Sequence, residues 1–70
     1  MKKVLLHENW GEVQRTAKVY LVHDTEDHYE VEFYQSEILR ETRKMITNGV
    51  SHNERYAEDA AENWCLGYIP

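Results

Sequence analysis

The side chains best able to bind a metal or take part in a reaction lie together in one polar stretch, residues 23–28. Two histidines flank three carboxylates there. Imidazole and carboxylate groups are common ligands of zinc and calcium in proteins. The stretch nevertheless lacks the alternating Asp or Asn, the central Gly and the terminal Glu of a calcium loop, and no Cys or His pair has zinc-motif spacing. We therefore expect an ordinary turn at residues 23–28, and we predict no metal and no cofactor.

The chain also lacks the residue patterns that are typical of enzymes. It has no glycine-rich phosphate loop, no Ser, His and Asp in a recognised catalytic context, and no carboxylate pair that spacing alone would set across a cleft. The histidines fall in a strand or at turns and element ends, where solvated side chains are more common than bases. They are His7, His23, His28 and His52. We therefore predict that the protein is not an enzyme.

Cys65 is the single cysteine, which excludes an internal disulfide and fits a reducing compartment. We expect it to be a half-buried, unreactive thiol, because no neighbouring base can be assigned to activate it. No apolar run is long enough for a membrane span, and the start of the chain turns polar too quickly for a signal peptide. We therefore expect a cytoplasmic protein.

Length and composition predict one small domain over residues 1–70. A chain of 70 residues is near the size at which a single core barely offsets chain entropy, but 41% of its residues are hydrophobic, including two Trp and five Tyr. The formal net charge is −5. An acidic chain disfavours nucleic acid as a partner, because binding to nucleic acid depends largely on neutralising phosphates.

Residues 51–66 carry the clearest helix signals. Ser51 and Glu54 have the spacing of a capping box, and Asn53 is an alternative cap that would start the helix two residues later. Gly67 is the residue type expected directly after a helix end. The apolar residues recur at helical spacing and therefore share one face, which we expect to be buried. They are Ala57, Ala60, Ala61, Trp64 and Tyr68.

The preceding residues predict strands. Residues 13–23 and 28–35 both alternate in side-chain character, and the short acidic turn between them predicts an antiparallel hairpin. A shorter strand is expected over residues 2–8. In the turn that follows, we expect Gly11 to use its freedom to adopt a positive φ. We expect Trp10 to close one end of the core, with an exposed anchor for a partner as the alternative. We expect the apolar side chains at residues 68–70 to fold back onto the sheet edge.

Residues 36–46 fit either a helix or a strand. As a helix, the segment would be capped by Ser36 and would end at Asn48 and Gly49. We prefer a strand, because a two-stranded hairpin would offer helix 51–66 little surface to cover. The predicted fold is therefore α+β: a small antiparallel meander of three to four strands packed on one C-terminal helix.

Three segments carry a likeness to known proteins: RYAEDAAENW at residues 55–64, YEVEFY at residues 29–34 and ETR at residues 41–43. In composition and order they resemble a group of short uncharacterised proteins encoded by phages of marine cyanobacteria, over roughly residues 17–67. The resemblance implies a small β-then-α domain made in the host cytoplasm during infection. It implies no activity, and it assigns no functional residue.

A small acidic domain without an evident pocket has mainly its surface to offer to a partner. We therefore expect a protein-protein interaction module that acts on a host or phage protein. The candidate binding surface is an acidic stripe on the helix, and the acidic turn at residues 24–27 can extend it. The alternative interpretation is that the stripe is a helix face that contacts only solvent. The stripe consists of Glu54, Glu58, Asp59 and Glu62.

Two further arrangements stay open. The alternative to a protein-interaction module is a nucleic-acid-binding module that uses a basic strand with Arg40, Arg43 and Lys44. Glu41 interrupts this basic strand, and the negative net charge of the chain disfavours binding to nucleic acid. The second sheet face is not polar, because it carries Tyr20, Val22 and Tyr34, so a homodimer through this face or through a sheet edge is a further expectation.

Overall fold

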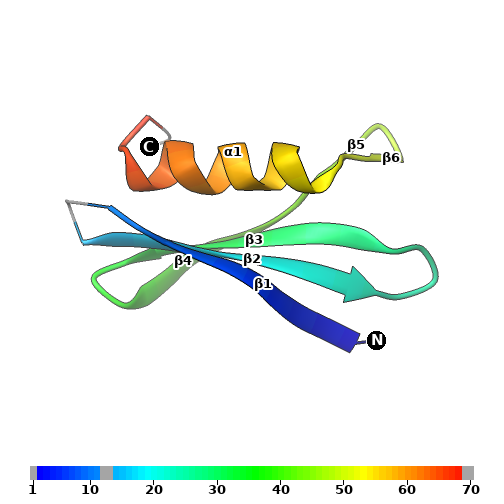
Figure 1. The fold of residues 1–70 in the computed structure, drawn as a ribbon, viewed down its shortest axis with the longest axis horizontal. Helices are drawn as coiled ribbons and strands as arrows, with labels where there is room; N and C mark the ends of the chain where they lie inside the picture. Colours follow the sequence, from blue (N-terminus) through cyan, green and yellow to red (C-terminus); the bar gives the residue numbers. More distant parts are fainter. Residues whose placement is uncertain (1, 12–13, 69–70) are drawn as a thin grey trace.

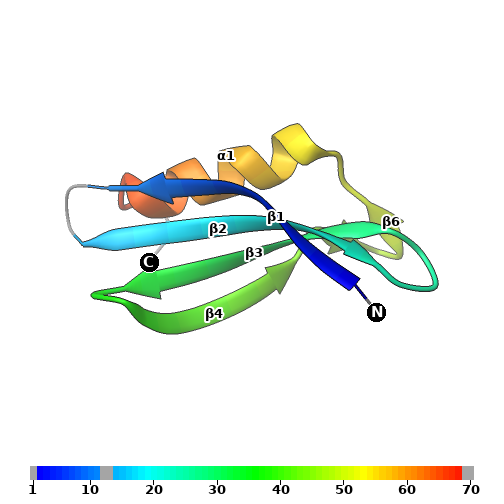
Figure 2. The same cartoon turned by 60° about the horizontal axis from the view of Figure 1, so that its bottom comes forward.

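Four strands form one antiparallel meander in the computed structural model, which describes residues 2–11 and 14–68. The strands are β1 (Lys2–Trp10), β2 (Arg15–His23), β3 (His28–Gln35) and β4 (Ile38–Lys44). They lie side by side in chain order (Figure 2). Helix α1 (Glu54–Cys65) lies lengthwise over one face of this sheet (Figure 1). The predicted α+β meander with one C-terminal helix is therefore confirmed, whereas the expectations for Val13 and for residues 69–70 lie outside the described residues.

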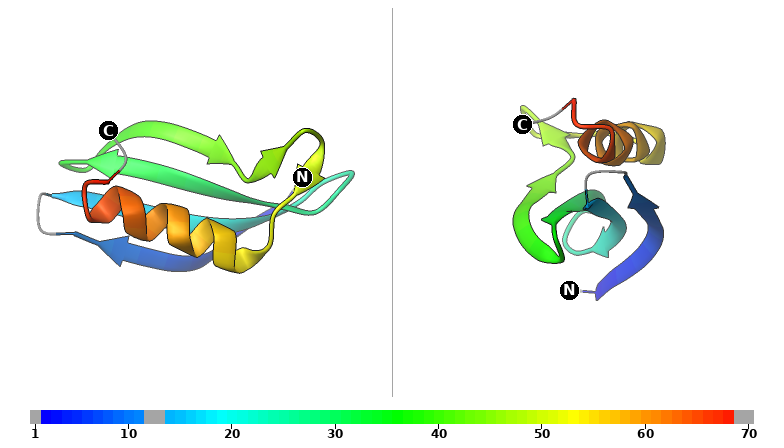
Figure 3. Two further views of the ribbon diagram at one scale, coloured as in Figure 1. Left: turned by 90° about the horizontal axis from the view of Figure 1, so that it is seen from above. Right: turned by 90° about the vertical axis from the view of Figure 1, so that its left-hand side faces the viewer.

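Strand β4 confirms the strand interpretation of residues 36–46 but not the reasoning behind it. Helix α1 packs mainly on β2 and β3 and then on β1, and β4 lies to one side of it (Figure 3). Every residue of β4 is exposed. The core is reached only by the next residue, Met45, which is buried and whose backbone N–H donates to the carbonyl of Tyr29 over 2.8 Å.

The core lies between α1 and the middle of the sheet. Small alanines on the helix allow its backbone to approach the strands, and Trp64 fills the space at the C-terminal end. Its ring stacks on Phe33 with the centroids 5.0 Å apart, and its Nε1–H donates to the carbonyl of Tyr34 over 3.0 Å. The main core residues are Ala17, Val19, Val31, Phe33, Met45, Ala57, Ala61, Trp64 and Cys65.

The helix begins at the alternative cap. The side chain of Asn53 accepts a hydrogen bond of 2.9 Å from the backbone N–H of Tyr56, so the expectation that Ser51 caps the helix was wrong. At the other end, Gly67 has a φ of 84°, as expected after a helix. This turn carries the chain off the helical path, and Tyr68 is therefore 74% exposed rather than buried with the alanines.

Ser51 instead belongs to a second, two-stranded sheet formed by β5 (Ile46–Thr47) and β6 (Val50–Ser51). The two residues between these strands, Asn48 and Gly49, have φ values of 52° and 79°. Positive φ at both positions is typical of the tightest hairpin turns, for which Asn-Gly is the preferred sequence. The sequence analysis treated these residues only as a turn or a helix end and missed the hairpin.

Gly11 is required for a reason other than the expected positive φ, which it does not have. A Cβ at this position would overlap the carbonyl oxygen of Cys65 and lie 2.8 Å from the carbonyl carbon. The backbone that follows β1 therefore touches the last residue of α1. This close approach holds the N-terminal strand against the C-terminal end of the helix.

We expect Gly11→Ala to lower the free energy of unfolding by about 1–3 kcal/mol, because the new methyl group must push backbone atoms apart. Urea denaturation of the purified protein measures this loss. Gly49→Ala is the matched control, because nothing lies within 4 Å of its Cβ position and only its positive φ opposes the substitution, at a cost of about 1 kcal/mol. A loss for Gly11→Ala no larger than that of the control would contradict the close approach.

Candidate functional site

The acidic residues of the predicted helix stripe do not all line the same hollow. Glu58 and Glu62 line a hollow between α1 and β1, and Glu54 meets the same strand one helical turn earlier. Asp59 instead lines a hollow on the other side of the helix, next to Met45. Three glutamates of the predicted stripe therefore form a row along β1 and Asp59 lines a different hollow, while the stripe as a partner-binding surface stays a prediction.

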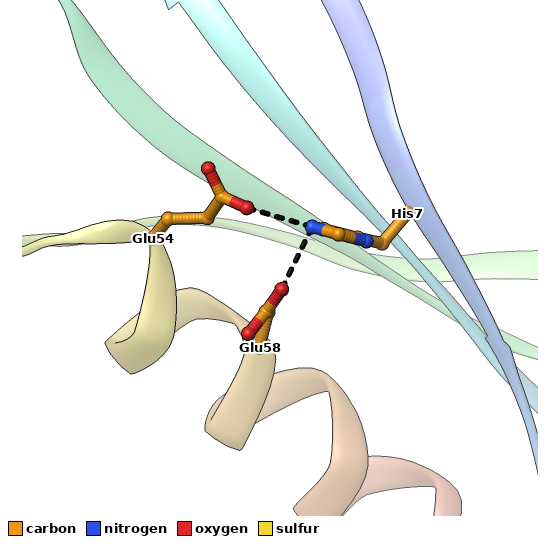
Figure 4. A group of neighbouring side chains, drawn as sticks. All are labelled: His7, Glu54 and Glu58. Carbon is orange, nitrogen blue, oxygen red and sulfur yellow. Dashed lines mark hydrogen bonds and ion pairs between the residues drawn. The ribbon is translucent and has the colours of Figure 1, made fainter.

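His7 of β1 meets the first two of these glutamates (Figure 4). Its Nε2 atom lies 2.8 Å from a carboxylate oxygen of Glu54 and 2.7 Å from one of Glu58. The three side chains are 39%, 43% and 42% exposed, so water still reaches the group. His7 is thus partly solvated, as expected, but its two carboxylate partners were not predicted.

A β-bulge brings His7 to this position. The register of β1 against β2 shifts between Leu5 and His7, so that Leu5 lies opposite Tyr20 and His7 lies opposite Val19. These two partners point to opposite faces of the sheet, because they are neighbours on β2. Leu5 and His7 therefore also point to opposite faces although they are two residues apart, and His7 lies on the face that α1 covers.

The two carboxylates alter the proton affinity of His7. The hydrogen bond to Glu54 raises the pKa of His7 above its ordinary value of 6.5; burial opposes this rise, and the charges of Glu58 and Glu54 add to it. Glu54 and Glu58 also repel one another as an i,i+4 pair, so a cation between them relieves the repulsion. Within residues 2–11 and 14–68 this is the only group of three or more His, Cys, Asp or Glu residues whose ligand atoms converge, and these atoms lie within 4.8 Å of one another.

The histidines of the polar stretch 23–28 have separate partners. His23 Nδ1 lies 3.1 Å from a carboxylate oxygen of Asp27 in the turn between β2 and β3. His28 is buried, and its Nε2 lies 3.1 Å from a carboxylate oxygen of Glu30. The expectation of a solvated side chain was therefore wrong for His28.

The sheet face opposite α1 carries a network of its own charges. Lys3 Nζ donates to one oxygen of Glu32 over 2.9 Å and lies 3.4 Å from Glu30. The Tyr34 hydroxyl donates to the other oxygen of Glu32 over 2.7 Å. This hydrogen bond, together with burial and the charge of Glu32, raises the pKa of Tyr34 to about 12. The buried acidic groups on this face are thus neutralised by the chain itself.

The same network involves the tyrosines that were expected to form a dimer surface. The ammonium group of Lys3 lies 4.4 Å from the ring centroid of Tyr20, and that of Lys18 lies 5.1 Å from the ring centroid of Tyr34. Val22 is fully buried within the chain and offers no surface to a second copy. A homodimer through this face stays a prediction, which light scattering of the purified protein tests.

The three cations of the predicted basic strand do not all lie on the same face of the sheet. Arg43 lies opposite Val31 on the α1 side, where it forms two hydrogen bonds of 2.8 and 3.1 Å with Glu41. Lys44 lies opposite Glu30 and so belongs to the other face. Arg40 lines a hollow beside Trp64. These residues do not form one continuous basic patch.

Trp10 is exposed, which contradicts the preferred prediction that it closes the core and agrees with the alternative of an exposed anchor. It is 72% exposed, and it lies opposite Thr16 on the sheet face that α1 does not cover. It separates two hollows, one of about 570 Å³ shared with Lys18 and Tyr34 and one of about 460 Å³ shared with Glu62. Trp10 is thus the most prominent accessible aromatic side chain beside a hollow.

Other exposed apolar residues lie at the same end of the molecule as Trp10. The end of β1, the turn between β3 and β4 and the C-terminal end of α1 all lie at this end (Figure 1). We call the exposed apolar residues of these segments the apolar end. They are Trp10, Ile38, Leu39, Leu66 and Tyr68.

Two loops at the apolar end are tied together in a strained conformation. Gln14, Ser36 and Glu37 have φ values of 59°, 52° and 68°, which non-glycine residues seldom adopt. The backbone N–H of Ser36 donates to the carbonyl of Gln14, and its hydroxyl donates to the Gln14 side chain, both over 2.8 Å. Positive φ at both Ser36 and Glu37 is typical of a two-residue hairpin turn, which here joins β3 and β4.

Cys65 lines the smaller hollow from within the core. It is buried, and this burial raises the pKa of the thiol above its ordinary value of 9.0, with Arg15 opposing the rise. A thiol with a raised pKa carries little thiolate at neutral pH. The expectation of an unreactive cysteine is consistent with this environment.

The Glu32 network predicts a pH-dependent contribution to stability. Burial opposes ionisation, but hydrogen bonds from Lys3 and Tyr34 outweigh it and lower the pKa of Glu32 below its ordinary value of 4.5. A lowered pKa in the folded state stabilises the protein above the unfolded value, and this contribution is lost as the pH falls through the folded value. We expect Glu32→Gln to be less stable by about 1–3 kcal/mol near neutral pH.

The difference between Glu32→Gln and the wild type should shrink as the pH is lowered below about 4.5, where Glu32 of the unfolded chain becomes protonated, and should disappear below the lowered pKa of the folded state, where Glu32 is protonated in both states. Denaturation at a series of pH values measures it. The exposed Glu8, on the same sheet face, supplies the control variant Glu8→Gln. A Glu32→Gln deficit that stays constant with pH would show that the loss is one of packing and not of charge.

Comparisons with known proteins do not indicate a function for this chain. No protein-family model matches the chain, and neither a curated protein nor a solved structure does. Over residues 2–11 and 14–68, no helix has both the length and the apolar character needed to cross a membrane.

Proposed function

We propose that this protein is a non-enzymatic protein-interaction module that binds its partner through the apolar end. The observation that carries the proposal is Trp10, which is 72% exposed beside two hollows. Tryptophan is the residue type most enriched among those that contribute most to binding at protein interfaces. Exposed apolar residues gathered in one region are a recurrent property of such interfaces.

The surroundings of Trp10 indicate the chemistry of the partner. Glu58 and Glu62 line the smaller hollow together with Trp10 and Leu66, and the chain as a whole has a formal net charge of −5. A partner segment that presents an apolar side chain next to a Lys or Arg suits this combination. The acidic residues would mainly raise the association rate, while contact with the indole would slow dissociation.

This proposal retains two residues of the predicted acidic stripe and adds the exposed apolar residues of the apolar end. Glu58 and Glu62 stay in the proposed surface, whereas Asp59 lies on the other side of α1 and is left out. The resemblance to proteins of marine cyanobacterial phages suggests where the partner is found. It would be a host or phage protein in the cytoplasm of an infected cyanobacterium.

A quantitative pull-down from a cyanobacterial lysate, treated with nuclease, tests the role of Trp10. We expect Trp10→Ala to reduce capture of the partner at least about tenfold, since loss of a central interface tryptophan typically costs 2 kcal/mol or more. The stability of the variant should be unchanged, because the side chain is exposed. Tyr56→Ala is the matched control, because Tyr56 is also an exposed aromatic residue but does not belong to the apolar end. Equal capture by the Trp10→Ala variant and the wild type would overturn the proposal.

The nuclease treatment also separates the alternative function from this one. If the chain binds nucleic acid through Arg40, Arg43 and Lys44, capture disappears when nuclease is added, and the double variant Arg40→Ala/Arg43→Ala abolishes it. If the apolar end is the binding surface, capture survives nuclease and that double variant behaves as the wild type.

A further inference from the structure

We propose that His7, Glu54 and Glu58 form a binding site for a divalent transition-metal cation, with Zn²⁺ as the best match. One imidazole nitrogen and two carboxylate oxygens converge there, with Nε2 at 2.8 and 2.7 Å from the two oxygens (Figure 4). The ligands come from a strand and from two consecutive turns of a helix, so rigid elements hold them. This site shares Glu58 and its hollow with the protein-binding surface proposed above, but the proposed metal site does not depend on that surface.

The contacts around the imidazole nitrogen favour a cation at this point. A ring nitrogen carries at most one hydrogen, which can point well toward only one acceptor. Two carboxylate oxygens nevertheless lie within 2.8 Å of the single Nε2 atom. A metal ion has no such directional limit and can accept lone pairs from all three atoms at once. It would also neutralise the two like charges that the helix places one turn apart.

The donor set selects the class of cation. Magnesium and calcium prefer oxygen ligands alone, whereas zinc accepts both imidazole nitrogen and carboxylate oxygen, at about 2.0–2.2 Å. Tetrahedral ligation at such lengths separates the ligand atoms by about 3.4 Å. The three donor atoms lie within 4.8 Å of one another, so small rotations of half-exposed side chains are sufficient. Three protein ligands leave a fourth position for water or for another ligand.

Access to the site is open on one side. His7 and Glu58 line the hollow of about 460 Å³ between β1 and α1, which gives an ion an entry path. Metal binding would cross-link the N-terminal strand to the first turns of the helix, segments that are 47 residues apart in the chain at the His7–Glu54 contact. A ligand that binds only the folded state stabilises it in proportion to the logarithm of its concentration.

Titration of the metal-stripped protein with Zn²⁺, followed by calorimetry and by thermal unfolding, tests this proposal. We expect saturable binding of one Zn²⁺ per chain, a rise in the melting temperature and no comparable effect of Mg²⁺. Binding should weaken as the pH falls, because protons compete for the imidazole and carboxylate ligands. Absence of saturable Zn²⁺ binding, or more than one equivalent site, would overturn the proposal.

Substitutions identify the ligands. Glu54→Gln, Glu58→Gln and His7→Gln should each weaken Zn²⁺ binding at least about tenfold. At a pH high enough for His7 to be neutral, the glutamate substitutions mainly relieve a repulsion. The metal-free glutamate variants should then unfold at or above the wild-type temperature, which separates loss of the site from loss of the fold. Unchanged affinity in all three variants would exclude this site.

Three control variants exclude other sources of binding. Glu62→Gln removes a neighbouring carboxylate one turn along α1, His23→Gln removes an exposed histidine, and Cys65→Ala removes the only thiol. Each should bind Zn²⁺ within about twofold of the wild type. A loss in Cys65→Ala as large as that in Glu58→Gln would assign the metal to the thiol, and a general loss across all carboxylate variants would indicate diffuse attraction to acidic residues.

Discussion

The placement of the functional residues depends on one irregularity, the β-bulge in β1 between Leu5 and His7. Side chains of a strand alternate between the two faces of the sheet, and an inserted residue reverses the alternation beyond it. Strict alternation from Val4 would place Trp10 on the face that α1 covers and would turn His7 away from the helix. The bulge exchanges these positions: it brings His7 to Glu54 and Glu58, and it leaves Trp10 in solvent.

The helix supplies the fixed frame for both features. Trp64 is held by stacking on Phe33, by its hydrogen bond to the Tyr34 carbonyl and by the guanidinium of Arg15, which lies 4.1 Å from its ring centroid. These contacts fix the position of α1 along the sheet. The close approach of Gly11 to the backbone of Cys65 fixes the end of the helix against the end of β1. The charges on the opposite sheet face are paired within the chain, which leaves the exposed apolar residues as the more distinctive surface.

The sequence was informative where its signals were local. The alternation in residues 13–23 and 28–35 and the alanine face of the helix predicted the architecture, and Asn53 was recognised as an alternative cap. The site was not predictable in the same way, because a bulge shifts the period of two without any glycine or proline to mark it. The partners of His7 are 47 residues or more away in the chain, so its contact with Glu54 follows only from the docking of α1. The Asn48-Gly49 sequence is typical of a tight hairpin turn, but it was interpreted only as a helix end or as the turn that leads into the next helix.

The order of the elements along the chain also affects its synthesis. The strands of a meander pair with their neighbours in sequence, so the sheet can assemble as it leaves the ribosome. Helix α1, which covers the apolar face of that sheet, is translated after all four strands. At ordinary elongation rates it follows β3 by a few seconds. Until α1 has docked, Val19, Val31 and Phe33 lack their cover, so an incompletely folded chain presents an apolar sheet face that is prone to association.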